Sequence, residues 1–299
     1  PFYNGDNVFY GTMQKAFDES NSVISCGSGV LYRRRALEDI GGFVEWNLVE
    51  DLVSSYEMHA RGWKSFYYPH ALTRGLAPWD INGVYHQRSQ WALDTFRLFI
   101  WDNMLFKKGL TTAQKMGYLS IPLAYLCSGF VFPIFFIIPL WGYLTGEYVL
   151  YGNVLWFFGL RLLYFLMMAV GLNYLFENNH PGKQFQMLFG IFPIYAASFL
   201  RAFFYPKGRK PGYRVTNVAS RRLTRLAAVK VLPQLLLFWA NAVLPFFAIF
   251  NDTSPGRFIL LNALVSGLGL WLMWQVLSAS LRSVKFAPGE HPDQHYVQQ

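Results

Sequence analysis

Residues 118–140 read YLSIPLAYLCSGFVFPIFFIIPL, a stretch without a single charged side chain. A helix rises 1.5 Å per residue, so a stretch of this length crosses the roughly 30 Å hydrocarbon core of a membrane. Residues 1–115, upstream of it, are mixed and polar, whereas long apolar runs continue downstream to residue 281. The stretch therefore marks the junction between a polar portion and a membrane portion of the chain.

The membrane portion, residues 118–281, contains three further apolar stretches of similar length. We expect four transmembrane helices, at about 118–140, 152–173, 226–249 and 257–280. Arg161 is the charged exception in the second. A charge at that depth usually faces the bundle interior or a water-filled path, so a functional role and a structural ion pair both stay open.

Residues 184–205 could also span, but Pro193 interrupts them. If they spanned, the cations of the loop 206–222 would lie on the opposite side from Lys107 and Lys108, against the positive-inside preference. We therefore expect an interfacial helix at 184–205. The loop 206–222 and the tail 282–299 are then cytoplasmic.

Composition supports a membrane protein. The 299 residues are 53% hydrophobic and only 14% charged, against about 25% charged in ordinary soluble domains. The net charge of +9 fits Lys and Arg gathering in cytoplasmic loops, and no basic stripe indicates nucleic-acid binding. Cys26 and Cys127 form neither a disulfide framework nor a metal motif. Because Pro1 is not preceded by Met, we expect a fragment that begins within a domain.

The polar portion predicts an α/β order. Strand candidates at 23–25 and 65–68 flank a helical pattern that begins at Glu50-Asp51 and ends at Gly62. We assign residues 1–79 to this domain. Amphipathic helices follow in 80–117; the first, within 80–106, suits a membrane surface, packing on the polar domain, or both.

Two groups of polar residues could perform sugar transfer. The Glu50-Asp51 pair could supply a carboxylate that takes a proton from an acceptor hydroxyl, although acidic residues also simply favour a helix N-terminus. The run Gln87-Arg88-Ser89-Gln90-Trp91 could supply a cation for a pyrophosphate and an aromatic face for a sugar ring.

These residues, in this order, resemble a known family. The chain is similar to the C-terminal part of processive family-2 glycosyltransferases, most closely the bacterial cellulose synthases. The resemblance rests on several motifs in order: Phe9-Tyr10-Gly11, Cys26-Gly27-Ser28, Gly41-Gly42-Phe43, Glu50-Asp51, Arg61-Gly62-Trp63, Leu76-Ala77-Pro78 and Gln87 to Trp91. It implies the C-terminal part of a GT-A-like α/β domain followed by an α-helical transmembrane bundle with interfacial helices.

The resemblance also implies roles for individual residues. Asp51 becomes the catalytic base. Trp91 stacks on the acceptor sugar, and Cys26, Gly27 and Ser28 line the acceptor end. Glu50, Gln87, Arg88 and Gln90 complete the predicted substrate-binding set, but Gln90 stands where the family has Arg, and Val49 where it has Thr. Tyr213, Arg214, Val215 and Thr216 resemble the family's gating loop.

The implied activity is elongation of a β-linked glucan from a UDP-sugar donor, with the growing polysaccharide as acceptor. Export would follow a membrane path lined by aromatics such as Trp156, Tyr164, Trp239 and Trp271. The implied cofactor is Mg2+ (or Mn2+), whose Asp ligands precede this chain; the chain itself has no DxD motif. We therefore expect no metal site here and an inactive fragment.

The resemblance places the protein in the inner or plasma membrane, among lipid and export subunits, with the transferase portion cytoplasmic. Two alternatives remain open. One is a non-processive transferase that adds a single sugar to a lipid carrier. The other is a non-catalytic membrane scaffold or transporter.

Overall fold

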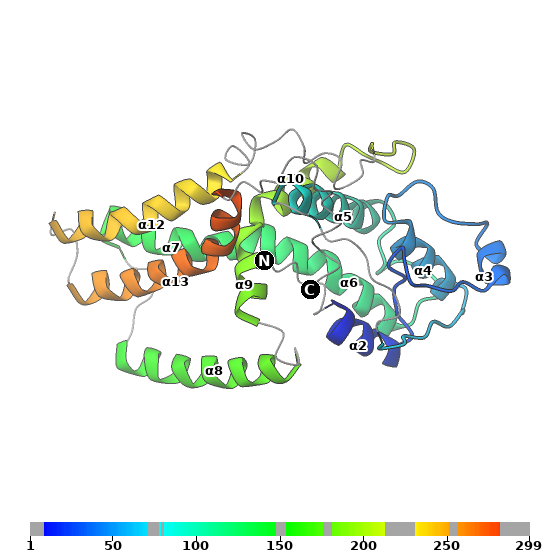
Figure 1. Cartoon of the computed structure of the whole chain (residues 1–299), viewed down its shortest axis with the longest axis horizontal. Helices are drawn as coiled ribbons and strands as arrows, with labels where there is room; N and C mark the ends of the chain where they lie inside the picture. The colour runs from blue at the N-terminus through cyan, green and yellow to red at the C-terminus, as the bar shows by residue number, and fades with distance from the viewer. Residues whose placement is uncertain are drawn as a thin grey trace, which may run out of the picture. The chain divides into compact units, whose positions relative to one another are not determined.

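A computed structural model describes residues 9–70, 78, 81–147, 154–175, 181–212, 231–250 and 256–281. These residues form two compact units (Figure 1). The N-terminal unit contains the described residues of 9–129 and 193–212, and the bundle unit those of 130–192 and 231–281. The helices are η1 (Phe9–Met13), α2 (Gln14–Glu19), α3 (Arg34–Asp39), α4 (Glu50–Ala60), α5 (Ile81–Trp101), α6 (Thr112–Leu126), η2 (Cys127–Val131), α7 (Phe132–Thr145), α8 (Val154–Leu175), α9 (Pro181–Gly190), α10 (Phe192–Ala202), α12 (Leu232–Phe250) and α13 (Gly256–Leu281).

The strands predicted at 23–25 and 65–68 are wrong, since no strand forms in the described ranges. Their backbone groups bond to side chains instead of to a neighbouring strand. The Gln14 amide bonds both the N–H and the C=O of Ile24. Similarly, Asn21 Nδ2 donates to Trp63 O, and Ser65 N donates to Asn21 Oδ1. Because these side chains satisfy the backbone groups to which they bond, those groups need no strand ladder. The predicted α/β character is not seen in the part of the chain that the structure describes.

Helix α4 forms the centre of the N-terminal unit. Its apolar positions 52, 53 and 56 lie on one helical face and are almost fully buried. They pack in one core with residues from α2, α5, α6 and the intervening segments: Phe17, Val23, Ile24, Leu98, Met104, Leu110 and Tyr118. This packing holds the first turn of α4, which carries Glu50 and Asp51.

Helix α5 is the amphipathic helix predicted within 80–106. It contacts α6, and its residues 81–85 and 92–98 are buried within the protein. Packing on the N-terminal unit is therefore confirmed, while a position at a membrane surface stays a prediction.

The first predicted span is longer than the sequence suggested. Residues Thr112–Thr145 form one run of helix, 34 residues long, that continues through η2. It begins at a capping box in which Thr111 and Gln114 satisfy each other's backbone N–H groups. The predicted boundary at 117/118 falls inside this helix, because the capping box starts the helix at Thr112, six residues earlier.

Three helices in the described ranges are long and apolar enough to cross a membrane: Thr112–Thr145, Leu232–Phe250 and Ile259–Ser280. They correspond to the first, third and fourth predicted spans. The second predicted span forms α8, whose apolar part Gly159–Gly171 is shorter. Helices α9 and α10 break at Ile191 with a bend of 48° and would together make a fourth candidate, so an interfacial position of 184–205 stays a prediction.

Within the bundle unit, α13 lies beside α7, α9 and α12 (Figure 1). Buried amides join these helices. Asn241 Nδ2 donates to Phe136 O at 3.1 Å, and Ser266 Oγ donates to Asn241 Oδ1 at 2.8 Å. Such hydrogen bonds stabilise helix association in lipid. Trp156, Tyr164, Trp239 and Trp271 are all exposed, and the glycan path assigned to them stays a prediction.

Candidate active site

Asp51 lies in the first turn of α4, where three hydroxyl and amide groups fix its backbone and side chain. Its Oδ1 accepts from Leu52 N at 2.7 Å. Its main-chain oxygen accepts from Ser25 Oγ at 2.9 Å and from Ser55 Oγ at 2.8 Å. Since Ser25 N also donates to Ser55 Oγ at 3.0 Å, the segment that begins at Ser25 is held against the start of α4.

The next residues of that segment lie beside the carboxylate. Gly27 has a φ of +69°, and a Cβ placed there would be 3.4 Å from Asp51 Oδ2. Only glycine adopts this left-handed backbone without strain. Cys26 precedes it and receives a 3.3 Å hydrogen bond from Gln14, while Ser28 is exposed. The fold therefore brings the predicted residues Cys26 to Ser28 together with the predicted base.

The carboxyl group of Asp51 titrates near neutrality. Burial is the main cause and the neighbouring charge of Glu50 adds to it, raising the pKa of Asp51 to about 6, against a lowering by the Leu52 N–H. A base is most effective when its pKa lies near the working pH. Asp51 is thus ionised at pH 7 and still basic enough to accept a proton from a hydroxyl group.

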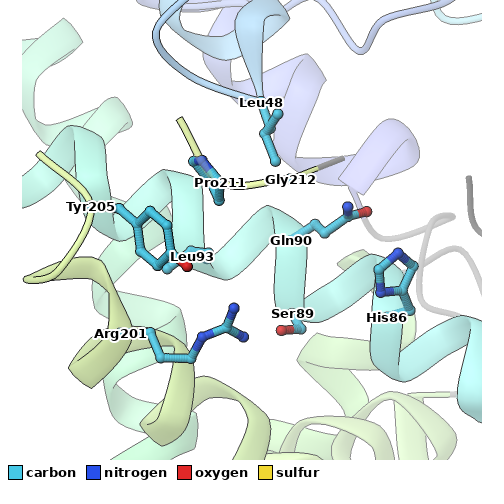
Figure 2. A pocket seen from close by; sticks show the side chains of 9 residues that line it. All are labelled: Leu48, His86, Ser89, Gln90, Leu93, Arg201, Tyr205, Pro211 and Gly212. Carbon is cyan, nitrogen blue, oxygen red and sulfur yellow. The ribbon is translucent and has the colours of Figure 1, made fainter. Parts of the chain in front are cut away.

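A cavity of about 340 Å³ lies between α5, the segment before α4 and the residues of and after α10 (Figure 2). Leu48, three residues before Asp51, forms part of its wall. The remaining lining residues are His86, Ser89, Gln90, Leu93, Arg201, Tyr205, Pro211 and Gly212. Hydrogen bonding between Ser198 Oγ and Ser89 O at 3.3 Å joins α10 to α5 beside the cavity.

The polar side chains of this cavity suit an anion. Gln90 Nε2 is a buried donor with no acceptor in the described part of the chain. Arg201 extends from α10 toward α5 (Figure 2) and is exposed. Ser89 and His86 add further hydrogen-bonding groups. A buried donor without an acceptor costs about 1–3 kcal/mol, so an oxyanion bound here would recover that free energy.

The other predicted residues of α5 lie outside the cavity lining. Arg88 places its guanidinium 4.7 Å from the centre of the Trp91 ring, a cation–π contact that covers one face of the indole. A sugar stacked on Trp91 would use the other face. Gln87 is partly buried. The predicted gating residues, Tyr213 to Thr216, lie outside the described residues.

No three His, Cys, Asp or Glu side chains lie close enough to hold a metal ion within the described ranges. The Mg2+ (or Mn2+) implied by the resemblance, with ligands that precede this chain in the family, stays a prediction.

Several site residues were missed by sequence reasoning. Ser25 and Ser55 position Asp51, but isolated serines carry no local signal. Arg201 lies more than 100 residues from Gln90 in the chain and reads as the basic end of an apolar helix. The Asp94 and Arg97 pair, spaced i, i+3 on α5, was detectable as charge on an otherwise buried face.

Comparisons with known proteins agree with these observations. The family model for cellulose synthase matches residues 6–177. Cellulose synthase 1 of Komagataeibacter xylinus is 36% identical over 120 residues, which are 40% of this chain and 8% of that protein. The UDP-forming cellulose synthase catalytic subunit of Xanthomonas axonopodis pv. citri is 32% identical over 117 residues, 39% of this chain and 16% of that subunit.

The corresponding subunit of Pseudomonas fluorescens is 30% identical over 142 residues, covering 42% of this chain and 19% of the relative. The matched part thus spans less than a fifth of the length of these relatives. The family model nevertheless covers more than half of this chain, including Asp51 and Trp91. The chain therefore belongs to the cellulose synthase family.

Proposed function

We propose that this chain is the C-terminal part of a membrane-embedded, inverting glycosyltransferase that elongates a β-linked glucan from UDP-glucose and exports it through its membrane helices. The observation that carries the proposal is the placement of Asp51. Its carboxylate lies beside the bare backbone of Gly27 and has a pKa of about 6. In addition, Leu48, three residues before Asp51, forms part of the wall of a cavity suited to an anion.

In the proposed reaction, Asp51 takes the proton of an acceptor hydroxyl. The hydroxyl oxygen forms a bond to C1 of the donor sugar, and the bond between C1 and the UDP oxygen breaks. The electron pair of that bond leaves with UDP, and the configuration at C1 inverts. Hydrogen-bond donors that stabilise the departing diphosphate lower the barrier.

The cavity beside Gln90 is our proposed place for that diphosphate. Gln is neutral and cannot supply the charge-assisted, bidentate contact that the family's Arg provides. Arg201, from α10, reaches the same cavity. We assign to Arg201 the cationic role that Gln90 lacks, with Gln90 Nε2 as a neutral donor beside it.

The orientation in the membrane is part of the proposal. Lys107, Lys108 and the basic residues that follow α10 lie on the cytoplasmic side by the positive-inside preference. Asp51 would then meet UDP-glucose in the cytoplasm. The Mg2+ (or Mn2+) site belongs to residues that precede this chain in the family, and a growing polysaccharide, membrane lipid and export subunits are its expected partners.

Product analysis with the full-length protein tests the function. Membranes that contain it, supplied with UDP-[14C]glucose, should form a high-molecular-weight product that a β-glucanase degrades. A single glucose on a lipid would favour the non-processive alternative. If the purified protein neither binds nor releases UDP, the scaffold or transporter alternative is favoured.

Substitutions test the role of Arg201. Arg201→Ala should raise the inhibition constant of UDP about 10- to 150-fold, the effect of losing a hydrogen bond of about 1.5–3 kcal/mol to a charged group. Arg34→Ala is the matched control, because Arg34 also carries one positive charge but pairs with Glu38 on α3, at 2.8 Å, outside the cavity lining. Adding Gln90→Arg to Arg201→Ala should restore UDP binding. An unchanged inhibition constant in Arg201→Ala would contradict the assignment.

A further inference from the structure

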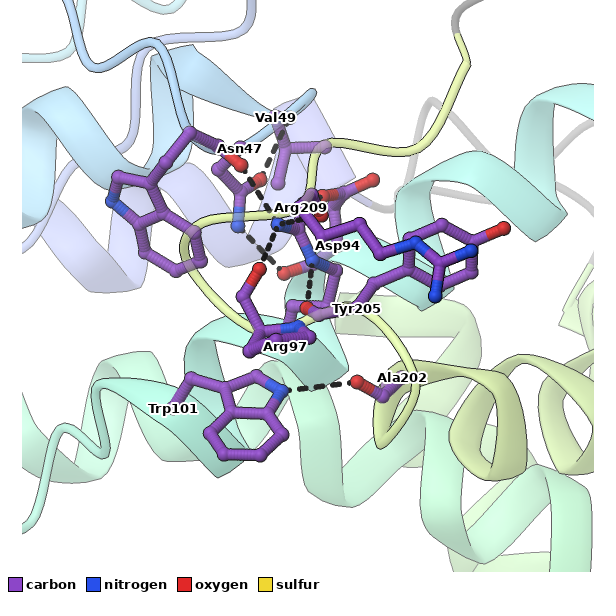
Figure 3. A network of polar contacts seen from close by, with 10 residues as sticks. Asn47, Val49, Asp94, Arg97, Trp101, Ala202, Tyr205 and Arg209 are labelled. Atoms are coloured by element: carbon purple, nitrogen blue, oxygen red, sulfur yellow. Dashed lines mark hydrogen bonds and ion pairs between the residues drawn. The ribbon is translucent and has the colours of Figure 1, made fainter.

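Arg97 is a fully buried cation on α5 that bonds to the main chain of two distant segments (Figure 3). Its Nη2 donates to Trp46 O at 2.8 Å. On the other side, Nε donates to Tyr205 O at 2.7 Å, and Nη2 also donates to Pro206 O at 3.2 Å and Arg209 O at 3.1 Å. Its charge is balanced by Asp94, which is equally buried.

These segments are the walls of the cavity. Trp46 precedes the lining residue Leu48 by two positions, Tyr205 itself lines the cavity, and Arg209 precedes the lining residue Pro211 by two positions. Leu93, four residues before Arg97 on the same face of α5, forms part of the cavity between them. The guanidinium of Arg97 therefore holds the two walls at a set separation.

A second connection runs from Arg97 to the catalytic base. Its partner Asp94 accepts at its main-chain oxygen from Asn47 Nδ2 at 3.0 Å. Asn47 Oδ1 in turn accepts from Val49 N at 2.9 Å, immediately before α4 begins. The start of α4, where Asp51 lies, is therefore joined to α5 at Asp94, the ion-pair partner of Arg97.

We propose that Arg97 is a positioning residue of the transferase reaction: it fixes the width of the diphosphate cavity and the register of Asp51 against it. The proposal rests on the proposed function. Arginine suits this role because a planar guanidinium carries five donors in fixed directions on three nitrogens. Nε bonds to Tyr205 O, Nη1 to Asp94 and Nη2 to Trp46 O. A lysine ammonium has three donors on a single nitrogen, so it cannot make all of these contacts at once.

Other contacts hold the segment after α10 from its outer side. Lys207 pairs with Asp102 at 3.1 Å and lies 5.2 Å from the centre of the Trp46 ring. Trp101 Nε1 donates to Ala202 O at 3.0 Å. Because these contacts remain when the guanidinium is removed, loss of Arg97 should loosen the cavity without detaching its walls.

Arg97→Lys in the full-length protein is the central variant, since it retains the charge beside Asp94. We expect the KM for UDP-glucose and the inhibition constant of UDP to rise about tenfold, equivalent to about 1.4 kcal/mol, together with a lower kcat. A merely structural role would reduce the folded fraction, and so the apparent kcat, but it would leave KM and the inhibition constant unchanged.

Arg34→Lys is the matched control. It makes the same substitution in the same unit, at an exposed arginine that pairs with Glu38 on α3 outside the cavity lining, so KM should not change. If Arg97→Lys does not fold, the double variant Arg97→Met with Asp94→Leu removes the buried charges as a pair, which proteins often tolerate. That variant should show the same rise in KM.

The outcomes separate the two proposals. If the wild-type protein does not bind UDP, the proposed function fails. If the wild-type protein binds UDP and the Arg97 variants bind it equally well with unchanged KM, the proposed function stands and the positioning role of Arg97 is refuted.

Discussion

Replacing Asp51 with Asn should make the protein less active and more stable at the same time. Burial raises the pKa of Asp51 from 3.8 to about 6, a difference of about 2 units. At about 1.4 kcal/mol per unit, the ionised carboxylate costs the folded state at most about 3 kcal/mol. Asp51 is only partly buried, so solvent screening reduces the expected cost to about 1–2 kcal/mol.

The sign follows from proton linkage. Between pH 3.8 and about 6, the folded protein holds the Asp51 proton that the unfolded chain has released, so stability falls as pH rises through this window. At pH 7 the full free-energy cost of the ionised Asp51 carboxylate in the folded state is present. Asn carries no charge and can still accept from Leu52 N, so Asp51→Asn should remove the cost at pH 7 and change stability little below pH 4.

The activity should change in the opposite direction. Loss of a general base lowers the rate about 10²- to 10⁴-fold. In the wild-type protein, the same carboxyl group should make kcat/KM fall below pH 6, to about a tenth of its plateau at pH 5. Because the diphosphate cavity is untouched, UDP inhibition should be nearly the same in Asp51→Asn.

The assays are UDP release by the full-length protein between pH 5 and 8, and thermal unfolding at pH 7.5 and pH 4. Asp51→Asn that retains more than a tenth of the wild-type rate would refute the assignment of the base. A lower unfolding temperature for Asp51→Asn at pH 7.5 would refute the reasoning about desolvation.

Three further predictions concern stability and topology. Burial lowers the pKa of His59 to about 4, so the unfolded chain binds a proton at this side chain first as pH falls below 6.5. The free energy of unfolding should therefore be about 2 kcal/mol lower at pH 5 than at pH 7.5. A His59→Gln variant whose unfolding has the same pH dependence as wild type would contradict this prediction. Gly109→Ala should destabilise the protein by about 2–4 kcal/mol, because its φ is +88° and the new Cβ would lie 1.8 Å from a main-chain oxygen of α4; Gly62→Ala, with a φ of +83° and open space around it, is the control for strain alone and should cost less. A cysteine at Gly146 should react with an impermeant thiol reagent added to intact cells and one at Gly208 should not; outside labelling at Gly208 would mean that α9 and α10 span the membrane.

The positions of several helices could be predicted from short stretches of the sequence. The uncharged residues 118–140 form a helix long enough to span a membrane, since apolar character over that length needs no partner to be recognised. The acidic pair at Glu50 begins α4, and Thr111 caps α6. Such signals are local, because a helix satisfies its own backbone hydrogen bonds within a few residues.

Only the tertiary structure decided what depends on distant residues. The segments at 23–25 and 65–68 have strand-like composition, but a strand needs a neighbouring backbone, and here side chains such as that of Gln14 take its place. In the sequence, the neutral Gln90 stands where the family has a cation, and only the fold places Arg201 at the same cavity. In the sequence, Arg97 is one of several charges on an amphipathic helix. Only the structure shows that its guanidinium donates to carbonyls more than 100 residues away. These contacts arise when the chain packs, and no local pattern along the sequence encodes them.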